Sequence, residues 1–314
     1  MSIYRLSSFL ILLLGSLGYA GLLMAREPIE PLPVNADYDS AKAAIGKELF
    51  FDPILSRDRS IACASCHNLN AGGADSREVS SGVNNVKGNI QSPTVLNARY
   101  NFKQFWNGRA ATLLEQAQGP IHNSAEMAMN SQEVEKRINA SKKYQALFSN
   151  SNPDKTISFS MILEAIVEFE KALVTPNSKF DRYLRSEVQL SQLEAAGYQT
   201  FKELGCITCH NGINIGGNSF QKMGTIIPYA FKEDFPDRYY LTNKEYNKNV
   251  FKVPTLRNIA LTAPYFHDAS SKTLKDAIKT MSYHNLGYVI TDKQVTALVA
   301  FLNTLTGEKP AILE

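Results

Sequence analysis

Cys63-Ala64-Ser65-Cys66-His67 and Cys206-Ile207-Thr208-Cys209-His210 are two copies of one pattern, Cys-x-x-Cys-His, and they hold all four cysteines of the 314-residue chain. Two thiols about one helical turn apart can each form a thioether with a vinyl group of haem, and the adjacent histidine then lies under the iron. Zinc binding by four thiolates and a redox dithiol are competing interpretations, but neither requires a histidine after each second cysteine. The pattern therefore predicts two covalently bound c-type haems, each with its histidine as an iron ligand.

The chain begins with one basic residue, Arg5, followed by an uncharged run over residues 6–25 that is rich in Leu, Ile, Phe and Ala. Such a run is typical of a signal peptide, whose apolar region is usually about 7–15 residues, and about 20 apolar residues also suffice to span a bilayer. We therefore expect residues 1–25 to be either a cleaved signal peptide or an uncleaved signal anchor that exports the protein. The proline-rich residues 26–38 are expected to be a linker.

The remaining chain, roughly 290 residues, is longer than a typical single helical core and suits two domains. The formal charge of +3 arises from 33 basic and 30 acidic residues. A balance this close gives no support for a polyanionic partner, so we expect no nucleic acid to bind. No cysteine is left over for a structural disulfide, because all four lie in the haem patterns.

Each haem pattern is followed by the same landmarks in the same order. These are Pro93-Thr94-Val95-Leu96-Asn97, Phe105-Trp106 and Thr112-Leu113-Leu114-Glu115 in the first copy, and Pro254-Thr255-Leu256-Arg257-Asn258, Tyr265-Phe266-His267 and Thr273-Leu274-Lys275-Asp276 in the second. Self-similarity of this kind indicates a duplicated unit. We therefore expect two related haem domains, residues 39–176 and 177–314.

Helical signals dominate the stretches between these landmarks. A capping box at Ser191 opens a helix that ends near Leu204, Thr291 opens another, and apolar residues at helical spacing predict a third over residues 158–173. The stretch Thr175-Pro176-Asn177-Ser178 breaks that third helix and is the expected boundary between the domains. No stretch has a convincing strand pattern, so the sequence predicts a mainly α fold without a sheet.

Several further stretches after about Asp39 form a specific set. They are Leu49-Phe50-Phe51-Asp52-Pro53, Leu55-Ser56-Arg57-Asp58, Phe105-Trp106-Asn107-Gly108-Arg109-Ala110, Gly119-Pro120-Ile121, Glu126-Met127, Val253-Pro254-Thr255-Leu256-Arg257-Asn258 and Pro264-Tyr265-Phe266-His267-Asp268. Together with the first haem pattern, they resemble the bacterial dihaem cytochrome c peroxidase family. The resemblance covers nearly all of the chain beyond the expected leader and linker.

The resemblance implies two tandem cytochrome-c-like domains that face each other. It implies that the N-terminal haem reduces hydrogen peroxide to water and that the C-terminal haem receives electrons from a small cytochrome c or copper protein. It also implies a periplasmic enzyme, often a homodimer, and the leader leaves open whether the protein is soluble or anchored by its N-terminal helix.

In the second domain the resemblance places a methionine iron ligand at Met281. A Met/His pair raises the potential of a haem, which suits an electron entry point. The alternative is that Met281 only packs in a helical core, as methionine often does. His267 is expected to form hydrogen bonds near the second haem rather than to bind iron, and the reserve candidates for the sixth ligand are Tyr283, His284 and Met223.

In the first domain the resemblance assigns two residues to the reaction. Glu126 matches the acid that lies above the iron, where a carboxylate can take a proton from one peroxide oxygen and return it to the other. By itself, a glutamate in a polar loop is more often solvated surface, so this role rests on the match. Trp106 matches an aromatic residue between the haems, where it can assist electron transfer, anchor the domain interface, or do both.

The sequence departs from the family pattern at two sites. Many members carry a histidine in the loop after the first haem pattern that closes the peroxide-binding iron, but here Val83 lies near that position and no histidine occurs between Asn68 and Ile121. His122 and Met127 are the remaining candidates for a closing ligand. The family's inter-domain calcium site is the second departure, because an asparagine is replaced by glutamine among the matching residues Gln91, Thr262 and Pro264. Calcium accepts varied oxygen geometry, so one calcium ion stays an expectation.

Two other functions remain open. The related methylamine-utilisation enzyme also lacks the closing histidine and oxidises residues of a partner protein, but it has tyrosine where this chain has Met281. A non-enzymatic dihaem electron carrier needs two six-coordinate irons, and the first domain offers few obvious sixth ligands.

Overall fold

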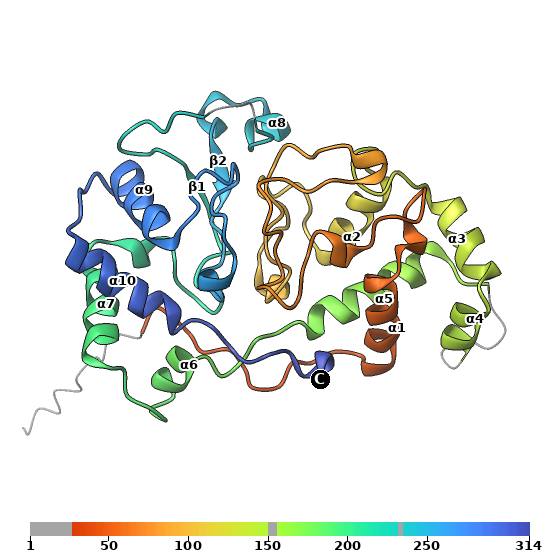
Figure 1. Cartoon of the computed structure of the whole chain (residues 1–314), viewed down its shortest axis with the longest axis horizontal. Coiled ribbons are helices and arrows are strands. Elements are labelled where there is room, and N and C mark those ends of the chain that lie inside the picture. The colour runs from red at the N-terminus through yellow and green to blue at the C-terminus, as the bar shows by residue number, and fades with distance from the viewer. Residues whose placement is uncertain (1–26, 150–155, 232–234) are drawn as a thin grey trace, which may run out of the picture.

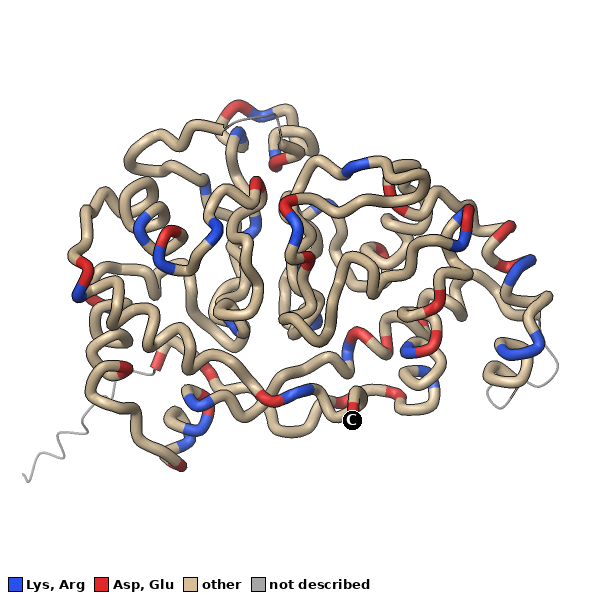
Figure 2. The backbone as a smooth tube through the Cα atoms, in the orientation of Figure 1, with Lys and Arg blue, Asp and Glu red and all other residues tan. Residues whose placement is uncertain are grey.

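The computed structural model describes residues 27–149, 156–231 and 235–314. The predicted leader, residues 1–25, lies outside this part of the chain. Within the part described, no helix is both long and apolar enough to cross a membrane. Basic and acidic residues are mixed along both halves of the molecule (Figure 2).

Two helical halves lie side by side (Figure 1). The N-terminal half contains α1 (Ser40–Phe51), α2 (Leu113–His122), α3 (Ser131–Ala140), α4 (Lys142–Ser149) and α5 (Phe159–Ala172). The C-terminal half contains α6 (Lys179–Leu184), α7 (Gln192–Glu203), α8 (Tyr239–Thr242), α9 (Leu274–Leu286) and α10 (Asp292–Asn303). The predicted mainly α fold is confirmed.

The predicted helix boundaries agree with the structure. Ser191 and Thr291 both form complete capping boxes, at the starts of α7 and α10, and Ser158 caps α5. Gly205, with a φ of 85°, follows the last turn of α7. The prediction that the chain has no sheet was wrong, because β1 (Phe220–Lys222) and β2 (Val250–Lys252) pair antiparallel. Strands of three residues are too short to show the alternation of apolar and polar residues that identifies a strand.

A glycine sits at the closest helix crossing in each half. A Cβ atom added to Gly46 of α1 would lie 1.9 Å from the carbonyl oxygen of Ala165 in α5. In the same way, a Cβ atom on Gly197 of α7 would lie 1.9 Å from the carbonyl oxygen of Ala297 in α10. The two halves therefore repeat one backbone-to-backbone crossing, as expected for duplicated domains.

Gly197→Ala is expected to destabilise the C-terminal half, because the added methyl group forces α7 away from α10. Overpacking of this kind costs about 1–3 kcal/mol or more of the free energy of unfolding. Thermal and denaturant unfolding of the purified protein measures this loss. The matched control is Gln199→Ala on the exposed face of the same helix, which should change stability little; equal stability of the two variants would contradict the close crossing.

The duplication also shapes the junction between the halves. Asn97 and Asn258 occupy equivalent landmarks, both have left-handed backbone conformations, and both donate a side-chain hydrogen bond of 2.8 Å to the Thr175 hydroxyl. Thr175 precedes α6 in the segment that connects the halves and is buried. One residue of the connecting segment thus joins equivalent points of both halves.

The two ends of the described chain cross to the opposite half. Ile29 and Leu32, in the segment expected to be a linker, are each only 1% exposed, and Ile29 packs in the C-terminal core. At the other end, the carbonyl oxygen of Ile312 accepts a hydrogen bond from Lys47 of α1. A buried ion pair between Arg257 and Asp181 (3.0 Å) further secures the N-terminal segment, because Asp181 also accepts a hydrogen bond from the Leu32 backbone amide. These crossings fix the halves relative to each other and so shape the space between them.

Candidate active site

One cavity of ≈ 760 Å³ extends through both halves, and its walls include the cysteines and histidines of both haem patterns. Each pattern begins with a short 3-10 turn, Cys63–Ser65 and Cys206–Thr208, that directs its cysteines toward this cavity. Within the described part of the chain, which includes all four cysteines, no three His, Cys, Asp or Glu side chains converge on a metal-sized site. The four-thiolate zinc alternative therefore does not fit this geometry.

The two histidines of the patterns suit iron ligation. His67 and His210 line the cavity, and burial lowers the pKa of both imidazoles, that of His210 to about 4. Both rings are therefore neutral at physiological pH, as an iron ligand must be. The Nδ1 atom of His67 lies 3.3 Å from the Gly73 carbonyl oxygen. A hydrogen bond there leaves Nε2 available for a metal. The residues present thus fit a haem in each half.

Glu126 lies on the wall of the N-terminal half of the cavity, in a loop that follows α2. Asn123 organises that loop: its side-chain amide donates to the Glu126 carboxylate at 2.6 Å, and its backbone carbonyl accepts from the Glu126 and Ala128 amides. Gly82 lies against the same loop, and a Cβ there would approach the Ala125 carbonyl oxygen to 2.1 Å. The carboxylate that the sequence selected is therefore held in place rather than free in solvent.

Arg109 lines the same half of the cavity as Glu126, and its guanidinium stacks 3.3 Å from the centre of the Phe105 ring. Burial raises the pKa of Glu126, while the Asn123 hydrogen bond and the positive charge of Arg109 partly oppose the shift. A raised pKa makes the carboxylate a stronger base, which favours proton uptake from a bound group. The arrangement is suited to acid–base chemistry on a small molecule in the cavity.

The two candidates for a closing ligand differ in position. His122 is exposed, stacks on Phe159 and lies 3.1 Å from the Ser131 hydroxyl, and it is not part of the cavity wall. Met127 is buried and does line the cavity. Val83 is buried next to the Glu126 loop, where its amide donates to the Glu126 carbonyl oxygen at 2.8 Å. Of the two side chains, only Met127 is placed to approach a group bound in the cavity.

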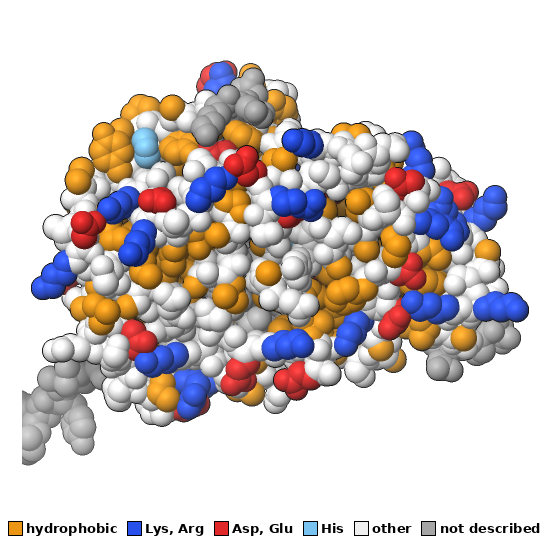
Figure 3. All heavy atoms as spheres, viewed as in Figure 1, with side chains coloured by type: hydrophobic (Ala, Val, Ile, Leu, Met, Phe, Trp, Pro, Cys, Tyr) orange, Lys and Arg blue, Asp and Glu red, His pale blue; other side chains and the backbone are white. Residues whose placement is uncertain are grey.

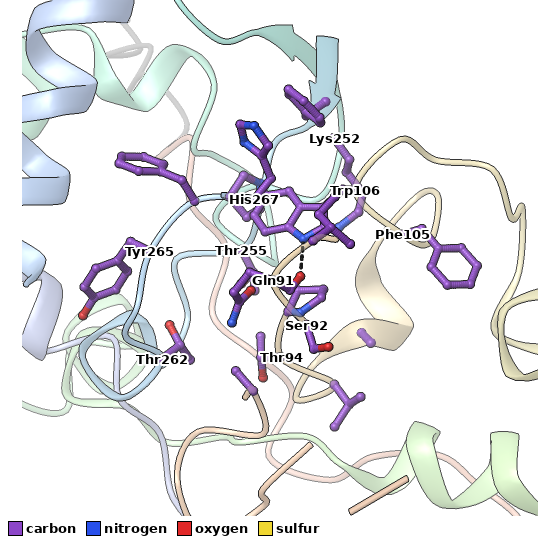
Figure 4. A pocket seen from close by; sticks show the side chains of 18 of the residues that line it. Gln91, Ser92, Thr94, Phe105, Trp106, Lys252, Thr255, Thr262, Tyr265 and His267 are labelled. Atoms are coloured by element: carbon purple, nitrogen blue, oxygen red, sulfur yellow. Dashed lines mark hydrogen bonds between the residues drawn. The ribbon is translucent and has the colours of Figure 1, made fainter. Parts of the chain in front are cut away.

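Trp106 lies where the two halves meet (Figure 4). Its indole nitrogen donates to the backbone carbonyl oxygen of Gln91 at 2.8 Å. The backbone amide of Gln91 in turn donates to the backbone carbonyl oxygen of His267 at 2.9 Å. The Lys252 amide donates to the Trp106 carbonyl oxygen at 2.7 Å. Trp106 is therefore hydrogen-bonded to the C-terminal half through its own carbonyl oxygen and, by way of Gln91, through its indole nitrogen.

The candidates for a sixth ligand in the second domain differ in whether they line the cavity. Met281 of α9 and Met223 both line the cavity. Tyr283 and His284 are not part of its wall, and His284 Nδ1 lies 3.0 Å from the Ile227 carbonyl oxygen. His267 lines the cavity with its Nε2 atom buried and without a partner in the described structure. Of the four candidates for a sixth ligand, Met281 and Met223 are therefore the two that line the cavity.

Gln91, Thr262 and Pro264, the residues expected to bind calcium, all line the cavity between the halves. Figure 4 shows the Gln91 and Thr262 side chains among those on the cavity wall. The side-chain amide nitrogen of Gln91 donates to the Asp75 backbone carbonyl oxygen at 3.2 Å. That contact orients the amide and leaves its oxygen for a cation, so the set offers neutral oxygen donors from both domains.

Two buried charged residues of the cavity wall, Glu170 and Lys252, were not selected from the sequence. Glu170 of α5 is buried, its Oε2 atom has no partner among the described residues, and burial raises the pKa of its carboxyl group to about 8. Lys252 of β2 is buried as well. The sequence could have identified Glu170 as a buried charge, because helical spacing places it on the same apolar face of α5 as Ile166. The signal for Lys252 was its place in the duplication, equivalent to Gln91.

Comparison with known proteins shows which family the chain belongs to. A model described as "Di-haem cytochrome c peroxidase" matches residues 40–189, and one described as "Cytochrome c" matches residues 194–306. Cytochrome c551 peroxidase of Nitrosomonas europaea is 45% identical over 96% of this chain and 91% of its own length. The chain belongs to the dihaem cytochrome c peroxidase family. Membership confirms the resemblance, and it makes the protein an oxidoreductase that acts on peroxide.

Other members of the dihaem peroxidase group are similar over most of the chain. Cytochrome c peroxidase Ccp of Escherichia coli is 43% identical over 90% of this chain, which spans 62% of that protein's length. Methylamine utilization protein MauG of Methylophilus methylotrophus is 30% identical over 88% of this chain and 86% of its own length. The crystal structure of a MauG-like protein associated with microbial copper homeostasis superimposes with a TM-score of 0.78 at 26% identity, covering 92% of this chain and 96% of that one. The dihaem character of the family supports two c-type haems here.

Proposed function

We propose that this dihaem peroxidase reduces hydrogen peroxide to water in the N-terminal half and receives the two electrons from a small cytochrome c or copper protein at the C-terminal half. One observation carries the proposal: a single cavity contains both Cys-x-x-Cys-His patterns, with Glu126 on its wall in the first half and Met281 in the second. Export by the expected leader and periplasmic function form part of the same proposal.

The proposed residue roles differ between the two halves. We assign covalent attachment to the four cysteines and iron ligation to His67 and His210; each haem, when bound, supplies an iron centre that exchanges single electrons. Met281 provides the sixth ligand in the C-terminal half, where a Met/His pair favours the reduced state. We assign no sixth ligand in the N-terminal half, so the side of the cavity opposite His67 would be kept for the substrate.

Glu126 moves the protons of the reaction. Its carboxylate accepts a proton from the nearer peroxide oxygen and returns it to the farther oxygen, which then leaves as water. Asn123 holds the carboxylate by the 2.6 Å hydrogen bond. The positive charge of Arg109 stabilises negative charge that develops on the oxygens as they separate.

Electrons are proposed to enter beside α9. Exposed apolar side chains gather at the C-terminal end of this helix, and orange atoms mark apolar groups on that half of the molecule (Figure 3). The residues are Ile226, Tyr283, Tyr288 and Val289, the last of which is 87% exposed. Met281 belongs to the same helix and faces the cavity. A redox protein with an apolar contact face can therefore bind close to the proposed sixth ligand.

We also propose one calcium ion between the domains, bound by the Gln91 side chain and by the Thr262 and Pro264 carbonyl oxygens. Calcium binds oxygen donors of this kind. The two halves contribute ligands from both copies of the duplication, so the ion would strengthen their contact.

The resting state of the protein tests the proposed function. Because His122 points away from the cavity and Val83 cannot bind iron, we expect the N-terminal iron of the oxidised protein to be high-spin, five-coordinate or water-bound. Peroxide should then react without prior reduction of the protein. Electron paramagnetic resonance of the oxidised protein, with stopped-flow mixing against peroxide, measures both properties.

Two low-spin ferric signals and no reaction before a reductant is added would contradict an open iron. Met127→Leu then decides whether Met127 is the closing ligand, since it lines the cavity and His122 does not. Two low-spin signals with no peroxide reaction after reduction would instead favour an electron carrier. Oxidation of a partner protein's residues, without peroxide turnover on a small donor, would favour the methylamine-utilisation type.

A further inference from the structure

Lys252 is a buried cation without a counter-charge. Its side chain is part of the cavity wall beside Trp106 (Figure 4), and the residue is only 8% exposed. No charged group of the described structure offsets its burial, which by itself lowers the pKa of the ammonium to about 8. Buried lysines are almost always paired, because an unpaired charge in a low-dielectric interior is strongly unfavourable. A negative group bound in the cavity at this point would offset that cost.

The duplication shows that this charge is particular to the second domain. The backbone amide of Lys252 donates to the Trp106 carbonyl oxygen, and the backbone amide of Gln91 donates to the His267 carbonyl oxygen. His267 is the landmark of the second copy that is equivalent to Trp106. Lys252 and Gln91 are thus equivalent residues in a reciprocal contact between the halves. The first copy has a neutral amide here, already bonded to the Asp75 carbonyl oxygen, whereas the second has a cation with no partner.

The chain around Lys252 leads to the haem pattern of the second domain. Pro254 follows two residues later, and its carbonyl oxygen lies next to the His210 imidazole, since a Cβ on Gly216 would approach both, at 2.2 Å and 3.4 Å. A c-type haem brings two propionate carboxylates with it. A haem attached at the second pattern and held by His210 would therefore bring its carboxylates into the cavity that Lys252 also lines.

We propose that the Lys252 ammonium binds a propionate carboxylate of the haem held by His210 and thereby raises the reduction potential of that haem relative to an uncompensated propionate. The inference rests on the proposed attachment of haem to the second pattern. The cation stabilises the reduced iron more than the oxidised iron, since reduction removes one positive charge from the centre. Lys252 acts here as a positioning and charge-compensating residue, outside the peroxide chemistry.

Lys252→Met tests this assignment in the holoenzyme, because methionine has a similar length and no charge. Spectroelectrochemical titration should show the potential of the His210 haem shifted down, by about tenfold in the ratio of oxidised to reduced iron at a given potential, which is ~59 mV for one electron. Lys252→Arg should restore most of the shift. Lys248→Met removes the same charge from an exposed position on the same segment and should leave both potentials unchanged.

Measuring haem content distinguishes a failure of the Lys252 assignment from a failure of the proposed function. Mass spectrometry and absorbance first establish that each variant has two haems, and their absence from wild-type protein would overturn the proposed function instead. If Lys252→Met does not fold with full haem content, Lys252→Gln replaces it, because the equivalent Gln91 is accommodated in the same backbone contact. With both haems present, an unchanged potential of the His210 haem in the neutral variant overturns the role of Lys252.

Discussion

Glu126→Gln is expected to lower peroxide turnover by about 10²–10⁴-fold, the usual contribution of a positioned general acid–base group. Glutamine keeps the shape of the side chain and the oxygen that accepts from Asn123, but it cannot take up and return a proton. Both haems should remain attached and peroxide should still bind. Stopped-flow measurement of peroxide binding and cleavage, beside steady-state turnover, separates the two steps.

The pH dependence of the same reaction gives a second measurement. Glu126 must be ionised to accept the first proton, and burial raises its pKa, so activity should fall on the acid side at a higher pH than for an ordinary carboxylate. This acid limb should vanish in Glu126→Gln. Glu164→Gln is the matched control, because Glu164 is a half-exposed residue of α5 that pairs with Lys42 and is not part of the cavity wall. Near wild-type turnover in Glu126→Gln would remove this residue from the mechanism.

Met281→Ala is expected to lower the potential of the C-terminal haem by on the order of 100 mV, a fraction of the ~0.8 V range that axial ligands span. The thioether favours ferrous iron, and its loss leaves a weaker or exchangeable ligand. Turnover should slow because electrons enter less readily, while both haems stay attached. Redox titration followed by absorbance measures the potential directly.

Met223→Ala is the control for this assignment, since Met223 is the other methionine on the wall of that half. The potential should be unchanged in Met223→Ala. A shift in Met223→Ala without one in Met281→Ala would transfer the ligand role to Met223, and no shift in either would contradict methionine ligation. The two methionines are separate in sequence, so the variants report on them independently.

The geometry of the proposed proton-transfer site depends on contacts that no sequence pattern displays. Glu126 was selected by a family resemblance, but Asn123, which holds its carboxylate, carries no motif of its own. His122 and Met127 looked equivalent as closing ligands. They differ because the helix α2 ends at His122 and the chain then turns, so that the imidazole stacks on Phe159 while the Met127 side chain enters the cavity.

The sequence by itself determined the features that depend on neighbours along the chain. These are the two haem patterns, the duplication, the family and the capping boxes at Ser191 and Thr291, all of which need only a few residues at short, regular spacing. Tertiary structure alone decided which side chains share the cavity between the halves. Lys252 became an unpartnered cation there because its surroundings come from both domains, and the short strands that position it form only when segments distant in sequence pair. The cost of burying a charge depends on everything packed around it, and that neighbourhood exists only in the folded chain.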